Sequence, residues 1–136
     1  MISADLLRGY TDSIILRRLL DRDGYGYQIS REVLRISGGK VELKEATLYT
    51  AFRRLEAAGY IRSYWGDEAT GARRRYYSLL DAGRKKLEED TTAWQETSKV
   101  MENLIAGLSS SVAPEEASPV TEREVQIEVA VSAEQE

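Results

Sequence analysis

The most constraining part of the sequence is Glu45–Tyr77, where the spacing of apolar residues changes from helical to alternating. Leu48, Phe52 and Leu55 recur at helical intervals, and strand-forming residues follow on both sides of a loop that has a glycine at each end. This order predicts one helix and then a two-stranded hairpin. The expected elements are a helix over residues 45–58, strands over 60–65 and 72–79, and a loop over 66–71.

Apolar spacing predicts further helices on both sides of this stretch. They cover residues 4–20, 27–36 and 81–108, and Val41 and Leu43 alternate as a short strand. Gly9 lies inside the first helix, where glycine costs about 1 kcal/mol relative to alanine, so we expect a close approach by another group there. Trp65 is expected to pack under the hairpin.

The last predicted helix has an apolar residue every seven positions. This stripe is typical of a helix that packs against another helix. Its members are Leu80, Leu87, Trp94, Met101 and Leu108. The fold class expected is therefore mainly α with a small β-hairpin: a winged helix-turn-helix over residues 1–80, which includes the N-terminal helix, and a long C-terminal dimerisation helix over 81–108.

The charge of the chain divides unevenly. The formal net charge is −4, but residues 109–136 contain seven glutamates and one arginine, so residues 1–108 carry 18 basic and 16 acidic groups. The tail over 109–136 is acidic, contains both prolines, and is expected to be disordered. In the body, six arginines gather within 23 residues and form what we call the basic patch. They are Arg53, Arg54, Arg62, Arg73, Arg74 and Arg75.

A helix with arginines on its exposed side, followed by an arginine-tipped hairpin, suits duplex DNA. The helix would read a groove, and the hairpin would contact the phosphate backbone. The candidate DNA-binding residues are Tyr49, Thr50, Arg53, Arg54, Arg73, Arg74 and Arg75. An ordinary solvated helix face and solubilising charge on an edge strand are the alternatives, and Tyr49 could instead fill a gap in the core.

The sequence argues against catalysis. It has neither cysteine nor histidine, so disulfides, thiol chemistry and a zinc site are not expected, and we predict no enzyme, no metal and no cofactor. Arginines interrupt the apolar residues at the N-terminus, so neither a signal peptide nor a membrane span is expected. A cytoplasmic protein without membrane contact is the expectation.

Three segments resemble the PadR family of bacterial transcriptional repressors: GYGYQI at 24–29, ATLYTAFRRLEAAGYI at 46–61 and GARRRYYSL at 71–79. The resemblance covers about residues 4–108. It implies a homodimer that binds a double-stranded DNA operator and no enzymatic activity. Lys44 and Leu80 depart from the family pattern, which usually has a polar cap before the DNA-reading helix and a threonine at the start of the last helix.

Within the family, AWQETSKVMENL and the segments before it are most similar to multidrug-resistance regulators of lactococci. That likeness implies a pore at the dimer interface in which Trp94 stacks on a planar aromatic effector. It also implies control of an efflux or stress gene. The pore positions carried over with Trp94 are Leu6, Gly9, Asp12, Ser13, Leu16, Arg17, Asp90, Thr91, Thr97 and Ser98.

Three other readings remain open. Trp94 could pack in a dimer core without contacting any ligand. The protein would then be a repressor that is ligand-independent or that responds to phenolic acids. The winged helix is also compatible with a protein-interaction module that does not bind DNA. An enzyme is the weakest reading.

Overall fold

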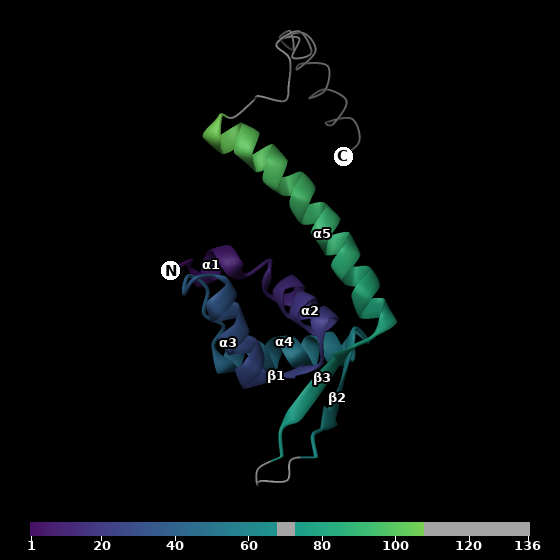
Figure 1. Cartoon of the computed structure of the whole chain (residues 1–136). Coiled ribbons are helices and arrows are strands. Elements are labelled where there is room, and N and C mark those ends of the chain that lie inside the picture. Colours follow the sequence, from purple (N-terminus) through teal and green to yellow (C-terminus); the bar gives the residue numbers. More distant parts are fainter. Residues whose placement is uncertain (68–72, 108–136) are drawn as a thin grey trace, which may run out of the picture. The chain divides into compact units, whose positions relative to one another are not determined.

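The computed structural model describes residues 1–67 and 73–107 of the 136-residue chain (Figure 1). The predicted tail over 109–136, Leu108 and most of the predicted hairpin loop lie outside the described residues. The chain divides into two compact units, Met1–Glu96 and Thr97–Glu136. The helices are α1 Ala4–Leu7, α2 Thr11–Asp21, α3 Gly26–Ile36, α4 Glu45–Ala57 and α5 Asp81–Met101. The strands are β1 Gly24–Tyr25, β2 Ile61–Trp65 and β3 Arg75–Leu79.

The core of the first unit is built from the helical apolar stripes that the sequence predicts. Helices α2, α3 and α4 surround it, and the sheet covers one side (Figure 1). Phe52 of α4 is 1% exposed and stacks on Tyr77 of β3, with ring centroids 3.9 Å apart. The largest side chains with under 2% exposure are Phe52, Ile15, Leu16, Ile29, Leu55 and Ile61. Burial of these side chains fixes which face of α4 remains in solvent.

The sheet has three antiparallel strands in the order β1-β3-β2. The sequence predicted the hairpin β2–β3 but not β1. Strand β1 pairs Gly24 with Tyr77 and Tyr25 with Tyr76. A strand of two residues is too short to show alternation, so the pattern could not reveal it. A Cβ on Gly24 would lie 3.3 Å from Ile29 Cγ1, so glycine allows the chain to pass close to α3 here.

The sequence predicted one continuous helix over residues 4–20, and this prediction is wrong. The chain makes α1, then a turn over residues 8–10, then α2. The Tyr10 amide donates to the Leu7 carbonyl, a tighter bond than the helical i to i−4 pattern. The weak helix propensity of Gly9 favours a break at this point. Within the described residues, nothing lies within 4 Å of a Cβ built on Gly9, so the expected close approach does not come from this part of the chain.

Two smaller predictions also differ from the structure. Val41 and Leu43 are buried but belong to no strand, since both side chains enter the core from an extended connection between α3 and α4. The Val41 amide donates to Ser37 Oγ rather than to a neighbouring strand. Trp65 is 58% exposed and does not pack under the hairpin, because it lies at the end of β2 beyond the core.

The first turn of helix α5 packs closely against the residue before β2. Gly83 is buried, and a Cβ there would lie 2.2 Å from the Tyr60 carbonyl oxygen, so only glycine lets α5 approach the start of β2 this closely. Leu87 lies one turn further along and enters the core. Helix α5 ends at Met101, and a π-helical turn over Glu102–Ala106 leads to Gly107 with φ 68°. Among the described residues, no helix is sufficiently long and apolar to cross a membrane.

Candidate nucleic-acid interface

Helix α4 presents one continuous face to solvent because its opposite face is locked into the core. Leu48, Ala51, Phe52 and Leu55 are buried. The helix ends at Ala57. Gly59 follows with a φ of 79°, which lets the Tyr60 amide return to the Leu55 carbonyl, and β2 then starts at Ile61. The short connection places the exposed face of α4 beside the hairpin β2–β3, which extends away from the helices (Figure 1). We call this hairpin the wing.

The centre of the exposed face carries three of the predicted DNA-binding residues. Arg53 is exposed and forms neither a hydrogen bond nor an ion pair with any residue of the described chain. Thr50 is exposed, and its hydroxyl donates to the Ala46 carbonyl at 2.9 Å, which orients the side chain on the helix surface. Tyr49 is 47% exposed, with its ring edge toward Phe52 at 6.4 Å, so it lies half in the core and half on the exposed face.

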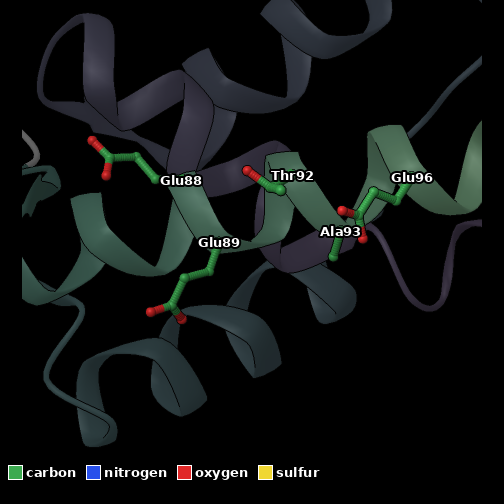
Figure 2. A pocket seen from close by; sticks show the side chains of 5 residues that line it. All are labelled: Glu88, Glu89, Thr92, Ala93 and Glu96. Atoms are coloured by element: carbon green, nitrogen blue, oxygen red, sulfur yellow. The ribbon is translucent and has the colours of Figure 1, made fainter.

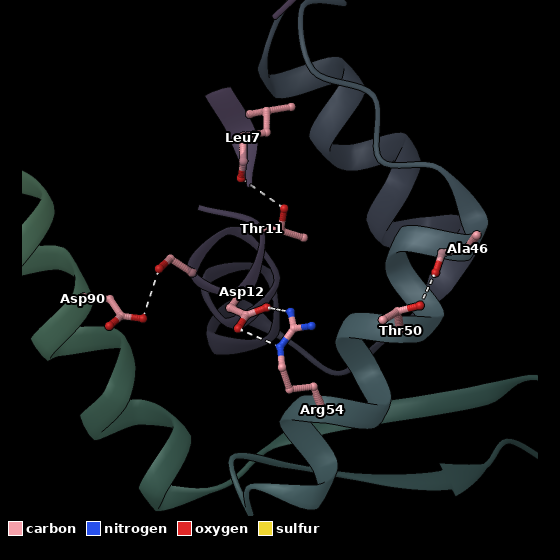
Figure 3. A network of polar contacts seen from close by, with 8 residues as sticks. Leu7, Thr11, Asp12, Ala46, Thr50, Arg54 and Asp90 are labelled. Atoms are coloured by element: carbon pink, nitrogen blue, oxygen red, sulfur yellow. Dashed lines mark hydrogen bonds and ion pairs between the residues drawn. The ribbon is translucent and has the colours of Figure 1, made fainter. Parts of the chain in front are cut away.

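Arg54 lies at the edge of the same face and is paired with Asp12 of α2 (Figure 3). Its Nε donates to Asp12 Oδ2 at 3.3 Å, and its Nη2 donates to Asp12 Oδ1. The hydrogen bond to this carboxylate raises the pKa of Arg54. A residue predicted to bind DNA is thus held by one predicted to bind a ligand.

The three consecutive arginines near the wing tip enter different environments. Arg75 begins β3, where its Nη2 donates to Ser63 Oγ at 2.8 Å and lies 3.5 Å from Glu56 Oε2. Arg74 places its guanidinium 4.7 Å from the ring centroid of Tyr25. Arg73 is exposed and has no hydrogen bond or ion pair with the described residues. Of the three, Arg73 is therefore the arginine that the described structure leaves open to solvent without such a contact.

The face of the sheet that points away from α4 has an aromatic cluster that the sequence reading missed. Tyr76 meets the Tyr25 ring edge-on at 5.3 Å and stacks on Tyr64 at 5.7 Å. The Tyr64 hydroxyl donates to Asp23 Oδ2 at 2.6 Å, which raises the pKa of Tyr64. The contacts of this cluster hold β1 against the wing. It depends on the pairing of β1 with β3, which no local pattern signals.

The predicted pore residues of the first unit have different surroundings within the described chain. Leu16 is fully buried in the core, and Arg17 pairs with Asp21 at 2.6 Å, a hydrogen bond that lowers the pKa of Asp21. Leu6 is 69% exposed, and Gly9 lies in the turn before α2. Thr91 donates to the Leu87 carbonyl. Thr97 and Ser98 belong to the second compact unit.

Ser13 and Asp90 do meet. Ser13 Oγ donates to Asp90 Oδ2 at 3.1 Å (Figure 3). Lys86 Nζ donates to Asp90 Oδ1 at 2.8 Å. The hydrogen bond to Asp90 raises the pKa of Lys86. Trp94 lies one turn beyond Asp90 and is 51% exposed, a large apolar surface to leave in water.

An open groove of about 410 Å³ runs along α5 (Figure 2). All of its lining residues come from this one helix, and three are glutamates. They are Glu88, Glu89, Thr92, Ala93 and Glu96. At 100° per residue these positions lie on the side of α5 opposite to Leu87 and Trp94. The groove is therefore separate from the predicted aromatic site.

Known proteins are similar to this chain over the residues of the candidate interface. A model of the transcriptional regulator PadR-like family matches residues 15–89. An uncharacterized protein of Lysinibacillus sphaericus is 40% identical over 108 residues, which make up 79% of this chain and 99% of that protein. A transcriptional regulator from Clostridium thermocellum is 41% identical with a TM-score of 0.70, over 75% of this chain and 99% of that one. A PadR family transcription regulator from Clostridium difficile is 36% identical with a TM-score of 0.63, over 71% and 99%.

Proposed function

Because the chain belongs to the transcriptional regulator PadR-like family, we propose that it is a homodimeric repressor that binds a pseudo-palindromic DNA operator. The family consists of transcription regulators, and the chain has their winged-helix fold. In our proposal α4 enters the major groove and the wing contacts the phosphate backbone. A two-fold dimer would place two copies of α4 on successive half-sites.

The observation that carries this proposal is the exposed face of α4 next to the wing. Arg53 and Arg73 are exposed and make no hydrogen bond or ion pair with the described residues. The core holds α4, which carries Arg53, and Arg73 lies two residues before β3. An exposed guanidinium on a rigid helix is suited to the paired acceptors of guanine or to phosphate.

Duplex DNA binding tests the proposal directly. The probe is a labelled 30-base-pair duplex pool of random sequence, from which the protein enriches its preferred sites. We expect binding that weakens steeply with salt, because each phosphate contact releases counterions. Binding that is absent at low salt would favour the interaction-module reading, in which the arginines meet an acidic protein.

For regulation, we propose that Trp94 contacts a planar aromatic effector at the dimer interface and that the protein controls an efflux or stress gene. Half-exposure of a large indole on α5, in line with Leu87, supports a site that a second copy would complete. An effector acts on DNA binding only if it binds the two arrangements of α4 with different affinity.

One set of observations favours a second candidate, a repressor in which Trp94 contacts no effector. Leu16 is buried, while Asp12, Arg17 and Asp90 are engaged by partners inside the chain. In that case Trp94 packs in the dimer core alone. A repressor that responds to phenolic acids belongs to the same alternative.

Replacing Trp94 separates these candidates. We expect Trp94→Ala to abolish binding of ethidium, a planar cation, since stacking and cation–π attraction are both lost. DNA binding should stay within about twofold of the parent, since no α4 contact changes. Trp65→Phe, which leaves Trp94 as the single tryptophan, is the parent for the fluorescence titration, and a hydroxycinnamic acid is the second ligand. Parent protein that binds neither compound would leave the effector proposal without support.

A further inference from the structure

We propose that Asp12 is a positioning residue for DNA binding: it holds the guanidinium of Arg54 at the edge of α4 so that the free N–H groups face a backbone phosphate. The inference rests on the proposed function, since it requires that α4 approaches DNA. It gives Asp12 a role on the DNA side of the molecule, where the sequence placed it with the effector.

The pairing leaves Arg54 able to bind a second anion. Asp12 accepts from Nε and Nη2, and a guanidinium has five N–H donors, so the other N–H groups remain open. The side chains of Arg54 and Asp12 are 54% and 34% exposed, and the arginine is the more exposed partner. A carboxylate on one edge and a phosphate on the other is an arrangement that the planar fork of arginine permits.

The residues before and after Asp12 both bond to other parts of the chain (Figure 3). Thr11 is buried and donates from Oγ1 to the Leu7 carbonyl at 3.2 Å. Ser13 donates to Asp90 of α5. These bonds fix the backbone of the first turn of α2 at Asp12, and the carboxylate holds Arg54 there without DNA.

Asp12 has two opposing effects on DNA affinity, and the direction in which affinity changes when Asp12 is replaced shows which effect is larger. An arginine that is already ordered loses less side-chain freedom when it binds, which favours DNA. The negative charge of Asp12 would repel phosphate, which disfavours DNA. We commit to the first effect because the two-point contact fixes Arg54 while leaving its outer edge open.

The test measures binding to the random-sequence duplex by fluorescence anisotropy across a salt series. We expect Arg54→Ala to weaken binding and to reduce the slope of log K against log salt by about 0.9, the value of one phosphate contact. Asp12→Asn should weaken binding about 2- to 10-fold, the ordering cost of one long side chain, although it removes a negative charge. In an Arg54→Ala background, Asp12→Asn should cause no further loss.

Asp21→Asn is the matched control. It removes one carboxylate from the same helix and breaks the comparable Arg17–Asp21 pair, which does not involve α4. We expect it to leave binding unchanged or slightly tighter. If Asp12→Asn tightens binding as Asp21→Asn does, or if its effect persists without Arg54, the positioning role is wrong.

Arg54→Lys is the second variant, used if Asp12→Asn melts below the assay temperature. It keeps the positive charge but cannot form the two-point contact with Asp12. Binding close to that of Arg54→Ala supports positioning, and binding equal to wild type overturns it. Failure of the wild type to bind duplex DNA would instead reject the proposed function, so the two results are distinguishable.

Discussion

Arg53 and Arg54 are neighbours in the sequence with different surroundings in the structure. One residue step on a helix turns the side chain by 100°, which moves Arg54 from the centre of the exposed face to its edge beside α2. There it finds Asp12, whereas Arg53 finds no ion-pair partner in the described chain. Two arginines in a row therefore offer one candidate for reading bases and one for contacting the backbone.

We expect Arg53→Ala to change which sequences are enriched from a random duplex pool. A groove contact carries sequence information, and one good two-point contact to guanine discriminates by about 1–3 kcal/mol. Thr50→Ala should shift the preference as well. Arg84→Ala, which removes an exposed arginine from α5, is the control and should leave the enriched sequences unchanged. Identical enriched sequences for Arg53→Ala and the wild type would place Arg53 outside the groove.

The apolar pattern predicted α4 and its buried face because that information is local. Leu48, Phe52 and Leu55 are buried at the positions that the helical spacing indicated, a prediction that the structure confirms. The partner of Arg54 could not be predicted, since Asp12 lies 42 positions away and the pairing depends on how α2 packs on α4. In the same way, the apolar pattern could not predict that Arg75 bonds to Ser63 and pairs with Glu56.

At the scale of elements, the failures of prediction share a cause. The break between α1 and α2 follows from one glycine within an apolar run that reads as continuous. Strand β1 exists only because β3 lies beside it. Val41 and Leu43 are both buried, with the exposed Glu42 between them, but this alternation has no strand partner. The spacing of apolar residues indicates which side chains are buried. Whether the backbone at those residues forms a helix or a strand depends also on its hydrogen-bond partners, which the spacing does not show.

The crossing of α5 over the start of β2 yields a prediction about stability. Gly83→Ala places a methyl group against the Tyr60 carbonyl, which is backbone and cannot swing away. We expect a loss of about 1–3 kcal/mol in the free energy of unfolding, the usual cost of overpacking. Ala82→Gly, at the exposed neighbouring position, is the control for a change of glycine content. Denaturant unfolding measures both, and an unchanged midpoint for Gly83→Ala would show that α5 can move away.

The wing yields a prediction about salt dependence. Arg73→Ala should weaken binding to all duplexes alike and lower the salt slope by about one, since a backbone contact carries charge without sequence information. The Arg73→Ala/Arg75→Ala double variant should lose more affinity and also some stability, because Arg75 ties β3 to Glu56 of α4. Arg8→Ala is the charge-matched control in the turn after α1. A slope that stays constant in the double variant contradicts the wing as a phosphate contact.

At the scale of the whole molecule, α2 connects the candidate DNA-binding helix to α5. Asp12 bonds to α4, and the next residue, Ser13, bonds to Asp90 of α5. Any rearrangement that moves α5 relative to the winged helix must strain or break one of these contacts. In our proposal, an effector beside Trp94 would reach α4 through these two neighbouring residues.

The acidic tail yields the last prediction. Ending the chain after Ser110 removes seven glutamates and one arginine. It keeps the exposed apolar residues that a second copy would cover, among them Trp94, Met101, Leu104 and Ile105. We expect the shortened protein to remain a dimer with unchanged melting temperature. It should bind the random-sequence duplex slightly more tightly, since the lost negative charge repels phosphate.

Light scattering after size-exclusion chromatography, thermal melts and anisotropy measure these three properties. As a control for composition, a full-length variant carries glutamine at all seven tail glutamates, which are positions 115, 116, 122, 124, 128, 134 and 136. It should reproduce the tighter binding if charge is the cause. A shortened protein that is monomeric or unfolded would instead make the alternating stretch Val125–Val131 a structural element, because its valines and Ile127 are the only regular apolar pattern that the truncation removes.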